Sequence, residues 1–338
     1  MTVARIRGLF EELRAGIRPI LDQILSHEPP DRSFLEQRFD RAAQLAFGRT
    51  IAERIGYDFR RGRQDETHHP FMTRFAAGDV RITTRVREND LGEALFSTIH
   101  EAGHALYEQN VDTRYDGTPL GGGISAGVHE SQSRLWENLV ARGRPFWDFF
   151  FPRLVEMFPS ELASVDVEQF HRAVNRVGRS LIRTDADEVT YNLHVMLRFE
   201  LEVAMLEGRL AVKDLPEAWN SRMQEDLGVR PPDDRDGCLQ DVHWFCTTMG
   251  GTFQGYTLGN LIAAQVYAAA ERALPNLSTQ IAEGEFAPLR AFLTEHVYRH
   301  GARYEPEELV LRATGAPLSP APFLEHLRRK YEPLYPMR

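Results

Sequence analysis

The five residues His100-Glu101-Ala102-Gly103-His104 constrain this chain more than any other segment, because their pattern is useful only on a helix. Two histidines four positions apart project from one helical face, one turn above the other. Their imidazoles can then share one Zn²⁺, while the glutamate beside the first histidine holds a metal-bound water and accepts its proton. The alternative is a solvated helix face that carries two histidines by chance.

The residues around this motif favour a metal site over that alternative. Asn89-Asp90 offers an N-cap, and the helical pattern runs from about Leu91 to Glu108. Apolar side chains flank the motif: Phe96, Ile99, Ala102, Ala105, Leu106 and Tyr107. Two histidines and a glutamate on a buried helix need partners, because unpaired polar groups there cost several kcal/mol. A metal ion supplies those partners.

Length and composition indicate a globular protein with a sizeable core. The chain has 338 residues, of which 42% are hydrophobic and 26% charged. Its net charge of −9 argues against nucleic acid or an anionic membrane as a main partner. Charged residues interrupt the apolar N-terminal segment, so we expect neither a signal peptide nor a membrane span. Two cysteines, Cys238 and Cys246, make no disulfide framework, and we predict a cytoplasmic protein.

The spacing of apolar residues predicts a mainly α-helical fold. One helix ends before Pro29-Pro30, and a second runs from about Ser33 to Ile55. Residues 79–86 alternate apolar and polar side chains and predict a strand, paired with residues 70–75 in a small hairpin or sheet beside the metal helix. Further helices are predicted at about 125–142, 146–158, 165–182, 185–209, 212–226, 255–274, 286–299, 305–312 and 319–331.

A catalytic zinc usually has three protein ligands and one open position, so a third ligand is needed beside His100 and His104. Glu130 is the best candidate, because it follows the predicted N-cap Ser125 of the very next helix. His129 is the rival ligand, but it would point about 100° away around that helix. We expect His129 to support the ligands or to cap the helix. Two histidines and one glutamate are typical of a hydrolytic zinc site.

The chemistry of such a site follows from its residue types. Zinc lowers the pKa of its bound water and polarises a carbonyl, and Glu101 takes the water's proton and passes it to a leaving amine. A second group must stabilise the developing oxyanion. His243, Tyr256 and Tyr191 are the candidates.

Several segments resemble the carboxypeptidase Taq family of metallocarboxypeptidases, in the order in which that family carries its motifs. The matching segments are His69–Phe71, Asp79–Thr84, His100–His104, His129–Ser133, Ile182–Asp187 and Gly237–Trp244. The resemblance implies a mainly helical, zincin-like fold with a deep active-site groove. It also implies the release of single amino acids from peptide C-termini, and homodimers.

The resemblance also suggests how substrate is bound. Arg183 lies at the family's arginine position and is our candidate for holding a free C-terminal carboxylate, since its guanidinium offers a bidentate fork. A surface salt bridge of Arg183 with Asp185 or Asp187 is the alternative. Gln240 and His243 are candidates for binding the substrate backbone or the oxyanion. Arg81 is a further substrate-binding candidate, with a structural role in the groove wall as the favoured alternative.

Two departures from the family pattern bear on the groove. Only 99 residues precede His100, where family members usually carry a much longer helical region. We therefore predict one domain over residues 1–338, with shortened N-terminal helices up to residue 60 and a catalytic body over 61–338. The segment 252–257 is also shorter and altered, which bears on the role of Tyr256. We expect a more open groove, or one that a partner subunit covers.

The leading hypothesis is a zinc carboxypeptidase that acts on peptides with a free C-terminus and forms a homodimer. Co²⁺ or Mn²⁺ could replace Zn²⁺ at such ligands. An open groove would allow an oligopeptidase or endopeptidase instead. A non-catalytic helical scaffold with a structural metal is the third hypothesis. The orientation of Arg183 distinguishes the first two, since burial in an ion pair would favour the endopeptidase.

Overall fold

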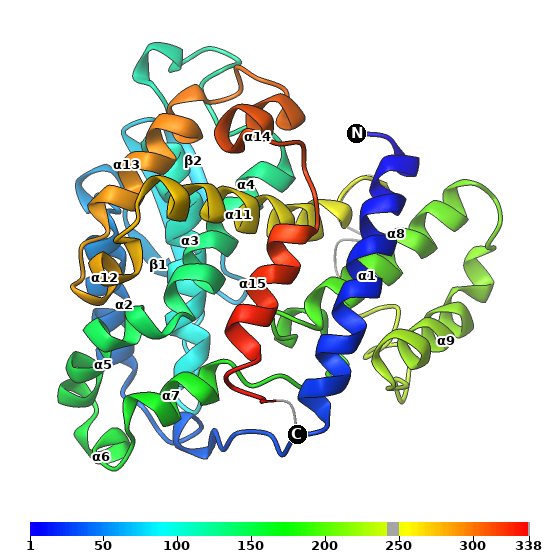
Figure 1. Ribbon diagram of the computed structural model, residues 1–338, viewed down its shortest axis with the longest axis horizontal. Coiled ribbons are helices and arrows are strands. Elements are labelled where there is room, and N and C mark those ends of the chain that lie inside the picture. The colour runs from blue at the N-terminus through cyan, green and yellow to red at the C-terminus, as the bar shows by residue number, and fades with distance from the viewer. Residues whose placement is uncertain (242–249, 337–338) are drawn as a thin grey trace. The chain divides into compact units, whose positions relative to one another are not determined.

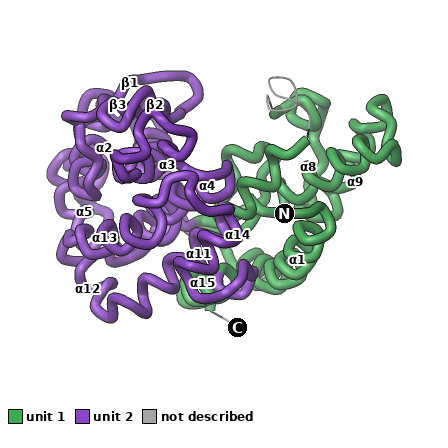
Figure 2. Tube along the Cα trace, turned by 90° about the horizontal axis from the view of Figure 1, so that it is seen from above, with its two compact units in different colours: residues 1–29, 176–258, 323–338 green, residues 30–175, 259–322 purple. Residues whose placement is uncertain are grey.

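The computed structural model describes residues 1–241 and 250–336 of the chain. Its contacts divide the chain into two compact units, which are coloured separately in Figure 2. Unit 1 comprises Met1–Pro29, Arg176–Leu258 and Phe323–Arg338, and unit 2 comprises Pro30–Asn175 and Gly259–Pro322. Each unit is described by itself below. The expectation of a single domain over residues 1–338 stays a prediction.

Unit 2 is built around the helix that carries the histidine motif, α3 (Leu91–Gln109). The Asp90 carboxylate caps this helix by accepting from the Gly92 backbone N–H at 3.0 Å. α3 is surrounded by α2 (Arg41–Ile55), α4 (Ala126–Arg134) and the sheet, and most of its side chains are buried. α4 approaches closely because Gly103 has no side chain: a Cβ there would lie 2.7 Å from the Gln132 carbonyl oxygen.

A three-stranded sheet lies beside α3 in unit 2, seen in cyan in Figure 1. Its strands are β1 (Gln64–Glu66), β2 (Met72–Ala76) and β3 (Asp79–Thr84), in the order β1-β3-β2. β2 and β3 form the predicted antiparallel hairpin, while β1 adds a parallel strand that the sequence did not predict. Alternate residues of β3 are buried, which explains the alternating pattern that predicted this strand.

The other helices of unit 2 enclose an aromatic core. In α5 (Arg144–Met157), the ring of Phe146 contacts Trp147, Phe150 and Phe286. A π-helical segment, Leu135–Ala141, continues directly from α4. The remaining helices are α6 (Pro159–Leu162), α7 (Val167–Val174), α12 (Leu277–Ala282), α13 (Ala287–His296), α14 (Pro306–Thr314) and, from Gly259 onward, α11 (Gln254–Ala273).

Unit 1 is a group of helices held together by apolar packing and by buried ion pairs. Its helices are α1 (Val3–Leu25), α8 (Tyr191–Leu206), α9 (Leu215–Leu227) and α15 (Ala321–Tyr331). The rings of Phe10 and Phe199 meet edge to face with centroids 5.2 Å apart, which joins α1 to α8. The buried carboxylate of Glu188 accepts from Lys330 Nζ at 2.7 Å and so holds α15.

The structure confirms the mainly helical fold with a small sheet, but several helix ends differ from the prediction. The helix expected over 33–55 begins only at Arg41, with Asp40 as its N-cap, after a separate 3₁₀ turn. The helix expected over 165–182 ends at Val174, because the Asn175 side chain donates to the carbonyls of His171 and Arg142. The 3₁₀ turns are Ser33–Leu35, Phe59–Arg61, Thr113–Tyr115, Arg183–Asp185, Val212–Asp214 and Tyr298–His300.

Two further expectations concern membrane-spanning helices and the active-site groove. Among the helices of the described residues, not one has the length and apolar character that a membrane crossing requires. The active-site groove implied by the family resemblance stays a prediction.

Candidate metal centre

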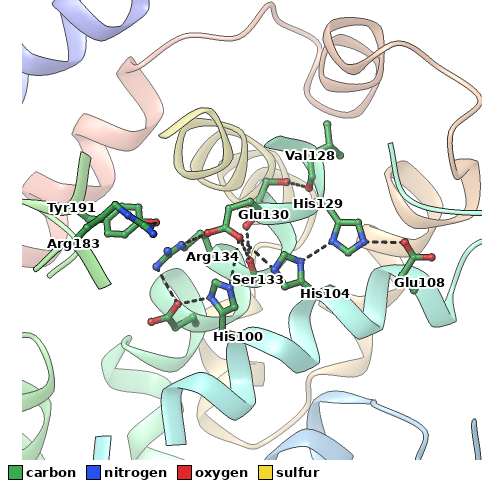
Figure 3. A network of polar contacts seen from close by, with 12 residues as sticks. His100, His104, Glu108, Val128, His129, Glu130, Ser133, Arg134, Arg183 and Tyr191 are labelled. Carbon is green, nitrogen blue, oxygen red and sulfur yellow. Dashed lines mark hydrogen bonds and ion pairs between the residues drawn. The ribbon is translucent and has the colours of Figure 1, made fainter. Parts of the chain in front are cut away.

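Three side chains of unit 2 converge as the sequence predicted. One ligand atom from each of His100, His104 and Glu130 lies within 4.8 Å of the others. The Glu130 Oε2 atom is 3.6 Å from His100 Nε2 and 3.3 Å from His104 Nε2. Figure 3 shows both rings turned toward this carboxylate, with Glu130 reaching down from α4 onto α3. We refer to these three residues, together with Glu101 and Glu137, as the metal centre.

Local backbone features place Glu130 over the two histidines. Ser125 begins α4 as predicted: its Oγ accepts from the Val128 N–H at 3.2 Å, and its φ of 52° is a conformation that non-glycine residues rarely adopt. On the other side of Glu130, Gly259 leaves room for it. A Cβ at Gly259 would lie 2.8 Å from Glu130 Cγ. Both features fix α4 and α11 around the carboxylate.

The second ring nitrogen of each histidine also has a partner. His100 Nδ1 lies 2.9 Å from Glu137 Oε2, and His104 Nδ1 lies 2.7 Å from His129 Nδ1. His129 therefore contacts one of the candidate ligands and is not in the converging group, and its expected supporting role stays a prediction. Its own Nε2 is 2.9 Å from Glu108 Oε1. Partners of this kind fix the orientation of metal-binding rings.

Two side chains of the next turn hold the Glu130 carboxylate. Arg134 Nε donates to Glu130 Oε1 at 2.8 Å, and Ser133 Oγ donates to Oε2 at 3.1 Å. Arg134 also lies 3.3 Å from Glu137 Oε2 through Nη1. One guanidinium thus holds both carboxylates in place, and the remaining lone pairs of Glu130 Oε2 face the histidines.

The π-helical segment explains how Glu137 is held. In a π-helix the residue five positions on comes round to the same side, and the Arg142 N–H indeed binds the Glu137 carbonyl at 3.0 Å. The Arg142 side chain then reaches Glu137 Oε1 at 3.3 Å. Its guanidinium also covers the Phe96 ring, 3.8 Å from the ring centroid.

The environment sets the protonation of these groups. Burial lowers the pKa of His104 to about 4, which keeps its imidazole neutral. Burial raises the pKa of Glu101 to about 7, and the neighbouring carboxylates of Glu130 and Glu137 add to the effect. Burial alone would also raise the pKa of Glu130, but Arg134 and His100 outweigh it and hold that pKa well below its ordinary value.

These donors fit a divalent metal ion such as Zn²⁺. Two imidazole Nε2 atoms and one ionised carboxylate oxygen face one point, and both imidazoles carry their partners on Nδ1. This is the donor set of a hydrolytic zinc site with three protein ligands. Glu101 lies beside the first ligand, is 6% exposed, and is not in the converging group.

In unit 1, Arg183 is buried in an ion pair. Its Nε and Nη2 atoms hold the two oxygens of Asp241 at 2.6 and 3.1 Å, and Nη1 donates to the Tyr191 hydroxyl at 2.8 Å. Arg198 contacts the same carboxylate through Nε at 3.0 Å. The partner is therefore Asp241 rather than the expected alternatives, Asp185 and Asp187. We call Arg183, Arg198, Asp241 and Gln240 the arginine cluster.

Two other substrate-binding candidates have partners within the chain. Gln240 uses its oxygen for the Arg183 N–H and Arg198 Nη2, and its amide nitrogen for the carbonyls of Leu181 and Asp236. These bonds give the side chain a structural role in the arginine cluster.

Arg81, on β3, forms a bidentate pair with Asp79 at 2.8 and 2.7 Å and covers the Phe75 ring, which agrees with the structural alternative. The substrate roles of Gln240 and Arg81 stay predictions.

The candidates for oxyanion stabilisation are placed in part. Tyr256 lies in the first turn of α11 and packs with Tyr191, Val195 and Phe253. Its ring centroid is 4.9 Å from the guanidinium carbon of Arg183. His243 lies outside the described residues. The roles of Tyr256 and His243 stay predictions.

Sequence reasoning missed the residues that support the ligands. No sequence motif marked Glu137 or Arg134 as supporting residues, although both follow Glu130 within two helical turns. Glu108 did carry a signal, since it lies one turn after His104 on the same helix face. Asp241 stood within a motif that was matched to the family, but its pairing with Arg183 spans 58 residues.

Comparison with known proteins agrees with this geometry. The family model of carboxypeptidase Taq (M32) metallopeptidases matches residues 1–331. Thermostable carboxypeptidase 1 of Thermus thermophilus is 48% identical over 99% of this chain and 66% of its own length. Carboxypeptidase 1 of Bacillus subtilis is 41% identical over 99% of this chain and 67% of its own. The chain thus spans about two thirds of the length of these curated relatives.

A solved structure gives the same result for the fold. The crystal structure of an M32 carboxypeptidase from Deinococcus radiodurans R1 matches with a TM-score of 0.98 and 57% identity. The match covers 99% of this chain and 67% of that one.

Proposed function

This chain belongs to the carboxypeptidase Taq (M32) metallopeptidase family, and from that premise we propose that it is a zinc-dependent carboxypeptidase. It would release single amino acids from peptides with a free C-terminus. The observation that carries the proposal is the convergence of His100, His104 and Glu130 within 4.8 Å, with the carboxyl of Glu101 buried beside them.

The metal ligands and Glu101 have separate roles in this proposal. His100, His104 and Glu130 would hold Zn²⁺, which when bound lowers the pKa of a water and polarises the scissile carbonyl. Glu101 accepts the proton of the attacking water and transfers it to the nitrogen of the leaving amino acid. A pKa of about 7 suits a group that must both accept and donate a proton near neutral pH.

The arginine cluster supports recognition of an anionic group. Arg183 and Arg198 share the single carboxylate of Asp241, so the positive charges exceed the negative one among these three buried side chains. We propose that Arg183 contributes this charge to the C-terminal carboxylate of the substrate. Tyr256, stacked on Arg183, and His243 are proposed to line the same site and to stabilise the oxyanion, and Gln240 and Arg81 to contact substrate.

One observation favours an oligopeptidase as the second candidate. The fork of Arg183 already holds Asp241 in a bidentate pair, so it lacks two free parallel donors for a second carboxylate. An enzyme of this kind would cleave blocked and free peptides alike.

Three further parts of the proposal, namely the native metal, the assembly and the location, are more specific than membership of the family. We propose Zn²⁺ as the native metal, with Co²⁺ or Mn²⁺ as substitutes, and a homodimer as the working assembly. We also propose a cytoplasmic location, where a thiol such as that of buried Cys238 stays reduced.

The test is hydrolysis by the purified chain of a peptide in two forms, one with a free C-terminus and one amidated. Each form is incubated with added Zn²⁺ and with a chelator, and products are followed by mass spectrometry. We expect the metal-dependent loss of single C-terminal residues from the free peptide only. Equal cleavage of both forms would establish the oligopeptidase, and no metal-dependent cleavage would reject both.

A further inference from the structure

We propose that His129 and Glu108 act as a positioning relay for the metal ligand His104. The relay holds the His104 ring in one orientation and in the tautomer whose Nε2 atom is free to bind metal, and so sets the metal affinity. This inference rests on the proposed metal centre and deepens it, because it concerns how one of the three ligands is prepared.

The contacts of the relay form an unbranched line away from the metal centre (Figure 3). His104 Nδ1 lies 2.7 Å from His129 Nδ1, and His129 Nε2 lies 2.9 Å from Glu108 Oε1. Glu108 stands one turn after His104 on α3, yet its carboxylate binds His129 of α4 instead of His104. The relay therefore crosses from α3 to α4 and back.

The positions of the donors and acceptors along this line show which tautomer of His104 the relay favours. An ionised carboxylate only accepts, so the His129 Nε2 atom that faces Glu108 carries a hydrogen. A metal ion held by His104 Nε2 takes the place of a hydrogen on that atom, so the hydrogen of the neutral ring lies on Nδ1. The Nδ1 atom of His129, 2.7 Å away, is placed to accept it, and this contact favours the tautomer of His104 that leaves Nε2 for the metal.

The end of the relay is itself fixed. Glu108 Oε1 also accepts from the Gly123 backbone N–H at 2.9 Å, and Arg74 of β2 lies 3.2 Å from Oε2. The Glu108 side chain is only 7% exposed. Gly123 passes so close that a Cβ would lie 2.7 Å from the His129 ring. The ring of His129 therefore has little freedom to turn.

The other histidine, His100, is oriented by a carboxylate directly, with no second imidazole between them. His100 Nδ1 meets the Glu137 carboxylate directly at 2.9 Å. The imidazole of His129 performs for His104 the task that a carboxylate performs for His100. Loss of a group that orients a ligand typically weakens metal binding by about 10–100-fold.

Three substitutions separate the two bonds of the relay. His129→Asn keeps an oxygen acceptor near the position of Nδ1, whereas His129→Gln can reach Glu108 but offers His104 no acceptor there. Glu108→Gln keeps the shape and removes the charge. His296→Asn is the matched control, since His296 lies on α13 and stacks on Phe292 outside the metal centre.

The main readout is the Kd for Zn²⁺ alone, from competition with a chromogenic chelator on the full chain. We expect Kd to rise about 10–100-fold for His129→Gln, and less for His129→Asn and Glu108→Gln. The control should equal the wild type. A Kd for His129→Gln within twofold of the wild type, or an equal rise for the Asn and Gln variants, would overturn the relay.

A spectroscopic readout separates positioning from general damage to the fold. In the Co²⁺-loaded protein, the Nδ1–H protons of His100 and His104 give two shifted exchangeable NMR signals. We expect only one of them to change in Glu108→Gln, while the unfolding temperature without metal stays at the wild-type value. Loss of both signals together would overturn the inference. Failure of the wild-type chain to bind Zn²⁺ would instead reject the metal centre itself.

Discussion

The metal centre and the arginine cluster are both buried and polar, but their charges are composed in opposite ways. In the metal centre and its supports, the three carboxylates of Glu101, Glu130 and Glu137 face two guanidiniums, from Arg134 and Arg142. In the arginine cluster, two guanidiniums face the one carboxylate of Asp241.

This difference in charge bears on which kind of ion, a cation or an anion, each region could bind. Burying a charge without a counter-charge is costly. We therefore expect an excess of one charge in a buried cluster where a bound ligand neutralises it or where the function requires it. The three converging donors of the metal centre could hold a cation, and the guanidiniums outnumber the carboxylate in the arginine cluster. The proposed carboxypeptidase would use both, since its substrate would be a peptide carbonyl beside a free carboxylate.

The prediction with the largest expected effect removes the carboxylate that is proposed to accept the proton of water, that of Glu101. We expect Glu101→Gln to lower kcat about 10²–10⁴-fold, because the proton acceptor is lost while the ligands remain. Steady-state kinetics on a free peptide and zinc content measure this. Glu93→Gln, in the first turn of the same helix, is the control and should keep full activity. Retained turnover in Glu101→Gln would remove it from the base role.

The second prediction removes the carboxylate of the arginine cluster. Asp241→Asn leaves the buried guanidiniums of Arg183 and Arg198 without their counter-charge, so the free energy of unfolding should fall by about 3–5 kcal/mol. Urea unfolding measures it. The same substitution at the more exposed Asp236 should cost less than about 0.5 kcal/mol. Equal losses would mean that Asp241 does not balance the cluster.

A pH titration tests the acidic side of the comparison. Ion pairs with Arg134 and His100 overcome burial and lower the pKa of Glu137 to about 2 from 4.5. The folded state therefore binds fewer protons than the unfolded state below pH 4.5. Stability is fully present above that pH and is lost as the pH falls toward 2.

We expect the zinc-free protein to lose about 2 kcal/mol through Glu137 between about pH 6 and about pH 3. Glu137→Gln should lack this part of the slope in chemical denaturation measured at each pH. Identical slopes for the two proteins would contradict the assignment.

The smallest expected effect separates the two arginines. Arg183→Lys keeps the charge but loses the fork, so KM for a free-carboxylate peptide should rise about tenfold with little change in kcat. Arg198→Lys is the matched control, because Arg198 contacts the same Asp241. A similar rise in KM for both variants would assign the effect to the shared ion pair rather than to substrate binding.

The convergence of the three candidate ligands could be predicted from sequence because it depends on local rules. His100 and His104 are one helical turn apart, and Glu130 follows a recognisable N-cap on the adjacent helix. The hairpin of β2 and β3 was predicted equally well from the alternation along residues 79–86. In each case the spacing along the chain determines the neighbours in space.

The supports could not be predicted in the same way, because they depend on contacts between distant segments. Asp241 meets Arg183 across 58 residues, and nothing in the spacing of residues 182–187 favours it over Asp185. Helix ends such as Val174 are set by a side chain, that of Asn175, which binds a carbonyl on Arg142. Tertiary contacts of this kind override local propensity.

The π-helical segment Leu135–Ala141 has a consequence for how this protein can change over time. It brings Arg142 over Glu137 only because one more residue occupies the turn than an α-helix would hold. Removing one residue between Glu137 and Arg142 would restore an α-helix in which the two residues are four apart and about 40° from one another, so the arginine would stay over the carboxylate. Straightening the segment into an α-helix at its present length would instead place Arg142 about 140° away. Descendants of this chain can therefore lose the extra residue and keep this ion pair, whereas substitutions that abolish the π-turn at constant length would break it.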